Sequence, residues 1–243
     1  MSTQDRISPS RDARIAAALL GLGAVAYTAW VLEAVLATGL DPIRTYVSEL
    51  AAESQELGGL FRATDLTAGL LVCAGAAWAL ARLGPHTLWF RVGWAGLLLF
   101  GAATAVDSRL PLSCTPTADP ECAARETDGL VPATHTAHAI SSSLAVTGAL
   151  IGLVVLTAAA RRDPHRRRSA LARFGPWLVA LELAVTVWTL SAVAAFQSGH
   201  GTWLLGLAQR AQVLLIAAWL ALLVRELLRV RGPRGAARAE AGR

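Results

Sequence analysis

Carboxyl, imidazole and hydroxyl side chains lie near one end of several long apolar segments of this chain, where charged groups are costly. Asp65, Asp107 and His138 belong to three different segments, and Ser48 and Glu49 lie in a loop that precedes the second segment. Carboxylates beside an imidazole can transfer protons, and a hydroxyl or carboxylate nearby can take part in hydrolysis. We expect these five residues to be the catalytic groups of an outward-facing site.

The depth of the charged residues follows from a rise of about 1.5 Å per helical residue. The three segment residues named above then lie roughly 3–6 Å from the outer boundary of the membrane, with Glu33 and Arg210 at about 7–11 Å. Five groups from five segments share one layer, so we expect them to face each other rather than lipid.

Glu33, Arg62 and Arg210 are candidate binding residues in or beside this layer. Glu33 and Arg210 are equally well explained as a buried ion pair that only fixes the register of two helices. Glu182 lies deeper, without a partner at its own depth. We expect it to be protonated or bonded to Thr186, outside the outer site.

His135 and His138 are three residues apart, so they project from the same side of a helix. Together with Asp107 they could supply three ligands to Zn²⁺, leaving a fourth position for water. Two imidazoles near a membrane surface are also explained by hydrogen bonds to loop carbonyls. The sequence leaves both interpretations open, and Zn²⁺ is the cofactor that the first one implies.

Cys114 and Cys122 lie in a long loop with Pro116 and Pro120 between them, which favours a compact turn. Outside the membrane such a pair is oxidisable, so a disulfide is expected. Free thiols or metal ligands are the alternatives, although the C-x-x-C spacing of zinc sites is absent. Cys73 lies inside an apolar segment, where we expect it to pack.

The segments that carry these residues are long enough to cross a membrane. Of the 243 residues, 54% are apolar and 16% charged, against about 25% charged in soluble domains. This composition excludes a disordered chain, a disulfide-rich miniprotein and an ordinary cytosolic enzyme. A membrane-spanning helix needs about 20 residues, and six segments qualify, which predicts an all-α, polytopic six-helix bundle: 15–38, 63–83, 92–110, 134–160, 174–197 and 202–228.

The arginines predict the orientation. All 22 basic residues are Arg, and 17 of them lie in the two terminal segments and in the loops that follow the second and fourth spans. This distribution places both termini in the cytoplasm of a cell whose inner (plasma) membrane holds the protein. It implies lipid contact, not nucleic-acid binding. The expected parts are an arm (1–14), a membrane domain (15–228) with outer loops near 39–62, 111–133 and 198–201, and a disordered basic tail (229–243).

The segment Pro-Ile-Arg-Thr-Tyr-Val-Ser-Glu-Leu at residues 42–50 resembles the hallmark of the domain of unknown function 998 family. That family consists of bacterial membrane proteins with six helices. Further positions fit it in order along residues 15–228, namely Asp65, Asp107, Cys114, Cys122, His135 and His138. The resemblance implies the topology and the location of the site. It implies no activity or substrate.

Three functions are compatible with these residues. The first is an outward-facing site that binds or hydrolyses a lipid or small polar molecule, with metal assistance in its most specific form. The second is a transporter or channel. Two observations argue against it: the charged groups cluster in one leaflet, and inverted repeats are not evident. The third is a non-catalytic assembly or sensory partner, for which an ion-paired bundle and a disulfide-tied loop would suffice.

Overall fold

The computed structural model describes residues 10–84, 87–164 and 166–229, and this part of the chain is built of helices and connecting loops. Six helical segments are long and apolar enough to cross a membrane, which confirms the predicted all-α architecture. The helices are α1 (Arg11–Tyr27), η1 (Ala29–Ala34), η2 (Val47–Ala51), α2 (Gly58–Arg82), α3 (Leu88–Asp107), α4 (Pro120–Thr127), α5 (Ala133–Arg162), α6 (Ala170–Gln197) and α7 (Leu205–Leu227).

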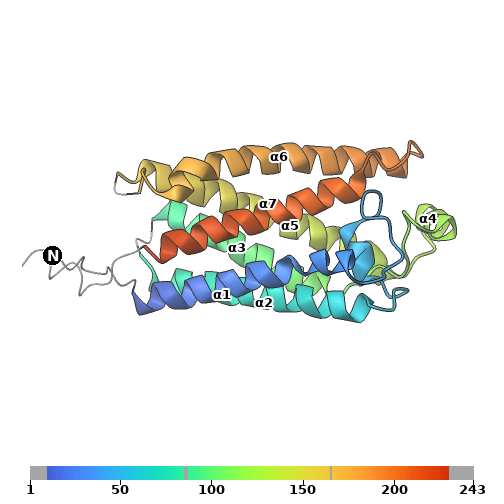
Figure 1. Ribbon diagram of the computed structural model, residues 1–243, viewed down its shortest axis with the longest axis horizontal. Coiled ribbons are helices and arrows are strands. Elements are labelled where there is room, and N and C mark those ends of the chain that lie inside the picture. Colours follow the sequence, from blue (N-terminus) through green and yellow to red (C-terminus); the bar gives the residue numbers. More distant parts are fainter. Residues whose placement is uncertain (1–9, 85–86, 165, 230–243) are drawn as a thin grey trace, which may run out of the picture.

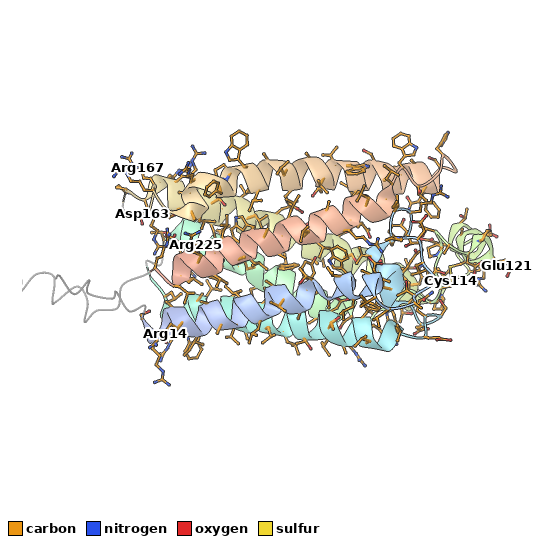
Figure 2. The ribbon with its side chains drawn as sticks, in the orientation of Figure 1. Arg14, Cys114, Glu121, Asp163, Arg167 and Arg225 are labelled. Atoms are coloured by element: carbon orange, nitrogen blue, oxygen red, sulfur yellow. A yellow bond between two sulfur atoms is a disulfide. The ribbon has the colours of Figure 1, made fainter. Side chains whose placement is uncertain are left out.

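The six long helices pack as a closed ring in chain order, in which each contacts the next and α7 returns to α1. Figure 1 shows them running side by side, with the start of α1 and the end of α7 at the same end of the bundle and α4 at the opposite end. Arg14, Arg167 and Arg225 lie at the first end, and Cys114 lies at the second (Figure 2). We call these the arginine-rich end and the disulfide end.

The first predicted span differs most from the structure. Its α-helix ends at Tyr27, and the chain continues as the 3₁₀ helix η1 instead of one helix to residue 38. The hydroxyl of Thr28 donates to the carbonyl of Val25 (2.9 Å), which occupies a backbone acceptor at the helix end. Glu33 therefore lies on η1, beyond the α-helix.

Two other helix boundaries differ from the predicted ones. Helix α1 begins at Arg11, before the predicted start of the first span at residue 15, and Ser10 accepts there from the backbone of Ala13 (3.1 Å). The loop expected at 111–133 contains α4, which Asp119 caps and Pro120 begins, both preferred at helix starts. The predicted basic tail lies outside the described residues except for Arg229.

Glycines bring α2, α3 and α5 into backbone contact. A Cβ atom on Gly69 of α2 would lie 2.5 Å from the backbone nitrogen of Ala105 on α3, and one on Gly148 of α5 would lie 2.5 Å from that of Phe100. Small residues allow such close approach in membranes, where packing drives helix association. These contacts position Asp65, Asp107 and His138, which lie on α2, α3 and α5.

The middle of the ring is filled by large apolar side chains. Leu97, Leu153 and Trp219 are fully or almost fully buried. Tyr27 packs edge-to-face against Phe100, with ring centroids 5.2 Å apart. Trp219 Nε1 donates to Thr157 Oγ1 (2.9 Å), which satisfies the buried indole. This core separates the polar groups of the disulfide end from the arginine-rich end.

Candidate functional site

Arg210 and Glu33 form the predicted buried ion pair. The Nε and Nη2 atoms of Arg210 donate to the two carboxylate oxygens of Glu33, both at 2.6 Å. Arg210 Nη1 donates to the carbonyls of Thr45 (2.9 Å) and Gly206 (3.1 Å). The pair is nearly inaccessible to solvent and links η1, α7 and the segment at 42–50.

Glu49 joins the 42–50 segment to the disulfide loop. Its side chain is fully buried, and its carboxylate accepts from the backbone nitrogen (2.7 Å) and the hydroxyl of Thr117. Burial raises the pKa of Glu49 to about 7, although the bonds from Thr117 act in the opposite direction. Glu49 therefore has a structural partner in the loop.

Ser48 and Arg62 make no hydrogen bond or ion pair with Asp107 or His138 in the described part of the chain. Ser48 is half-buried on η2. Arg62 donates to the carbonyls of Ala51 (2.6 Å) and Ala52 (3.2 Å), which satisfies backbone acceptors at the end of η2. The geometry therefore gives Arg62 a supporting role for the loop.

Asp107 and His138 are the centre of a compact polar cluster. The Nδ1 atom of His138 lies 3.1 Å from Oδ1 of Asp107 and 3.0 Å from the carbonyl of Leu110. The hydroxyl of Ser142 lies 3.1 Å from each oxygen of Asp107 and 3.3 Å from Nε2 of His138. Ser141 donates a further short hydrogen bond to Asp107.

The partners of His138 determine its tautomer. The carboxylate of Asp107 and the carbonyl of Leu110 are acceptors, so Nδ1 carries the proton. In the neutral ring Nε2 is then an acceptor that faces the hydroxyl of Ser142. The result is a chain of contacts from carboxylate to imidazole to hydroxyl, which is the order of groups in a Ser-His-Asp triad.

Asp107 and His138, two of the three residues predicted to converge, are in direct contact. Asp65 on α2 is the third, and its convergence with them stays a prediction. Within the described residues Asp65 makes no hydrogen bond, and it is only half-buried.

The expected zinc ligands are not assembled. The Nδ1 atom of His135 lies 3.0 Å from the hydroxyl of Ser113 and 3.2 Å from the backbone nitrogen of the same residue. Its Nε2 atom lies 3.9 Å from Glu126 and has no hydrogen bond. Across residues 10–84, 87–164 and 166–229, no three His, Cys, Asp or Glu side chains could hold a metal ion. The set of Asp107, His135 and His138 therefore does not fit Zn²⁺, because His135 contacts Ser113 of the loop instead of the other two residues.

The expected disulfide is present between Cys114 and Cys122, whose Cα atoms are 6.0 Å apart. Cys122 lies on α4 and is completely buried, whereas Cys73 on α2 is a free thiol. The bridge closes the loop that contains Thr117 and therefore supports the contact with Glu49.

Glu182 on α6 is fully buried and stands beside Gln212 and Thr186. Neither carboxyl oxygen of Glu182 has a hydrogen-bond partner among the described residues, so the predicted bond from Thr186 is not formed. Gln212 Nε2 donates to Thr186 Oγ1 instead (2.8 Å).

Ser142 was not among the residues expected from the sequence to be catalytic. It lies four residues after His138 on α5, a spacing that places both on one face of a helix. The three consecutive serines at 141–143 within a membrane span were the available signal.

Comparison with known proteins agrees with the resemblance of the 42–50 segment. The family described as "Protein of unknown function (DUF998)" matches residues 11–226. No curated protein and no solved structure matches the chain. With nearly all of the membrane domain matched, the chain belongs to the DUF998 family.

Proposed function

We propose that this protein is a membrane-embedded hydrolase that cleaves an ester or amide bond of a lipid or small polar molecule reached from the disulfide end. The observation that supports it is the chain of contacts from Asp107 through His138 to Ser142. A hydroxyl next to a base that a carboxylate orients is the arrangement that activates a nucleophile.

In the proposed reaction, Ser142 Oγ attacks the carbonyl carbon of the substrate and its proton passes to Nε2 of His138. Asp107 stabilises the resulting imidazolium through Nδ1–H, as in other triads. The proton on Nε2 then passes to the leaving alcohol or amine. Water, deprotonated by the same nitrogen, releases the acyl group and restores the hydroxyl of Ser142.

The carboxylate of Asp65, which makes no hydrogen bond in the described part of the chain, gives this site a preference among substrates. A hydrogen-bond donor of the substrate, such as a hydroxyl or ammonium group, would pair with it. Charge-assisted hydrogen bonds of this kind are about twice as strong as neutral ones. The substrate is therefore expected to carry a hydroxyl or amine near the bond that is cleaved.

The two other functions have less support. A transporter needs a path of polar groups toward the arginine-rich end. Glu182 is buried within the bundle, but the core that separates the two ends is filled by Leu97, Leu153 and Leu220. A purely structural role does not require the contact between the hydroxyl of Ser142 and Nε2 of His138.

The proposal places the disulfide end outside the plasma membrane and both termini in the cytoplasm. Disulfides persist in oxidising compartments, and arginines are enriched on the cytoplasmic side. A membrane-impermeant thiol reagent applied to intact cells after reduction should label Cys114 and Cys122. Labelling only after cell lysis would place the disulfide end inside.

A fluorophosphonate probe tests the nucleophile, because it reacts covalently with activated serines. In the detergent-purified protein, peptide mass spectrometry should locate the adduct on Ser142, and Ser142→Ala should remove it. Ser143→Ala is the matched control, since the hydroxyl of Ser143 is exposed and donates to the carbonyl of Ala139 (2.7 Å). Labelling that is absent, or that persists in Ser142→Ala, would overturn the proposal.

A further inference from the structure

The arginine-rich end contains a cavity that the proposed reaction does not use. Its volume is about 590 Å³, within the range of small-molecule sites. All six long helices line it, including the start of α1, the start of α3 and the ends of α5 and α7. The apolar core lies between this cavity and the cluster around His138.

The deeper lining of the cavity is apolar. Trp94, Leu156, Leu171 and Leu223 line it, and each of these side chains is at least nine-tenths buried. Such a surface favours a hydrocarbon chain over water. Because the cavity lies at a membrane boundary, an acyl chain can reach this surface with its polar group at the rim.

Four charged residues of the lining are already paired. Arg82 and Asp12 form one ion pair (3.9 Å), and Arg166 and Asp163 form another (3.4 Å). These pairs join α2 to α1 and close a turn after α5. They leave one charge of each sign in the lining.

The remaining positive charge is Arg162. Its guanidinium lies over the ring of Trp89, with Cζ 4.2 Å from the ring centroid. It forms no ion pair with a residue in the described part of the chain. A guanidinium held in this way presents its N–H groups to a phosphate.

The remaining negative charge is Glu226, in the last turn of α7. Only 6% of the residue is exposed, and its Oε2 atom is buried without a hydrogen bond. An unpaired buried carboxylate is costly, so a donor from a ligand would stabilise it. An ammonium group supplies both the positive charge and the N–H donors that Glu226 lacks.

From these observations we infer that the cavity binds a phospholipid whose head group carries a primary amine next to the phosphate. Its phosphate contacts Arg162, its ammonium group contacts Glu226, and one acyl chain covers the apolar lining. This site is distinct from the proposed hydrolase site and does not depend on it.

Native mass spectrometry of the delipidated full-length protein in detergent tests this inference with three probes. Lysophosphatidylethanolamine should bind one molecule per chain. Lysophosphatidylcholine with the same acyl chain should bind about tenfold or more weakly, because its quaternary ammonium has no N–H for Glu226. Glycerophosphoethanolamine, which has the head group alone, should not bind measurably.

Two variants separate the charges. Glu226→Gln and Arg162→Gln should each weaken lysophosphatidylethanolamine binding about tenfold or more. Arg161→Gln, at the exposed neighbour that does not line the cavity, should bind like the parent protein. Arg162 is on the rim and exposed, so its variant reports binding even if Glu226→Gln fails to fold.

Equal binding of the two lysolipids, or unchanged binding in either cavity variant, would overturn the inference. Binding of glycerophosphoethanolamine as tight as that of the lysolipid would also overturn it, because the ligand would then be a soluble zwitterion.

Discussion

Two polar networks lie at the disulfide end, and they differ in how completely their groups are paired. Arg210 and Glu33 match each other with two hydrogen bonds, and Nη1 of Arg210 reaches the backbone carbonyls of Thr45 and Gly206. The cluster of Asp107, His138 and Ser142 shares one hydroxyl between two acceptors and leaves Asp65 unbonded. Both carboxylate oxygens of the first network are bonded to Arg210, whereas the carboxylate of Asp65 makes no hydrogen bond in the described residues.

This difference separates the structural role of the ion pair from the reactive role that we propose for the cluster of Asp107, His138 and Ser142. A buried ion pair whose groups are satisfied fixes the register of the elements that carry it. A cluster with an unbonded acceptor and an imidazole-bound hydroxyl retains the capacity to bind and to transfer a proton. Variants in each network should therefore change different observables.

The largest effect on stability is expected at the ion pair. Glu33→Gln leaves the guanidinium of Arg210 buried without its counter-charge, which costs about 3–5 kcal/mol. The double variant Glu33→Gln/Arg210→Met should cost less, because no buried charge remains. Free energies of unfolding in detergent check this order. A double variant less stable than Glu33→Gln would show that the pair contributes beyond cancelling its own charges.

Loss of the disulfide should have the next largest effect. Replacing Cys114 and Cys122 by Ser should lower the free energy of unfolding by roughly 2–4 kcal/mol. The contact between Thr117 and Glu49 depends on this loop, so hydrogen exchange at the Thr117 amide should also accelerate. Unchanged exchange at Thr117 would show that Glu49 holds the loop without the bridge.

Loss of a glycine contact between α2 and α3 should have a smaller effect on stability. A Cβ on Gly101 would lie 2.5 Å from the backbone nitrogen of Cys73, so Gly101→Ala must separate α2 from α3 at a cost of about 1–3 kcal/mol. Gly21→Ala is the matched control, because its nearest neighbour would be 3.9 Å away. Equal unfolding free energies for the two variants would show that the close contact of α2 with α3 at Gly101 does not contribute to stability.

The smallest effect is a dependence of stability on pH. Burial raises the pKa of Glu49 to about 7 from an ordinary value of 4.5. Its protonated form therefore stabilises the fold fully below pH 4.5, and this contribution is lost as the pH rises through 7. Glu49→Gln should reduce the change in melting temperature between pH 4.5 and pH 7, whereas the exposed control Glu53→Gln should show the same change as the parent protein. Parallel profiles for the parent protein and Glu49→Gln would refute the assignment.

The six long helices could be predicted, because the length of an apolar segment that crosses a membrane depends on the thickness of the hydrocarbon layer. The end of α1 at Tyr27 could not be predicted, because Trp30, Val31 and Leu32 are equally apolar in an α-helix and in a 3₁₀ helix. The change between the two depends on tertiary contacts rather than on hydropathy.

The contact between Asp107 and His138 could be predicted, because depth along a helix assigns both residues to one layer. His135 was assigned to the wrong neighbours because its partner, Ser113, lies in a loop whose path the sequence does not specify. Ser142 was missed because serines in membrane helices commonly bond to carbonyls of their own helix, as Ser143 does.

The measurement that most directly tests the central claim is the rate at which a fluorophosphonate labels Ser142 in the parent protein and in His138→Gln. If His138 is the base for Ser142, the variant should label at least about a hundredfold more slowly while keeping its melting temperature. Equal rates in the two folded proteins would contradict the account, since the hydroxyl would then react without its imidazole.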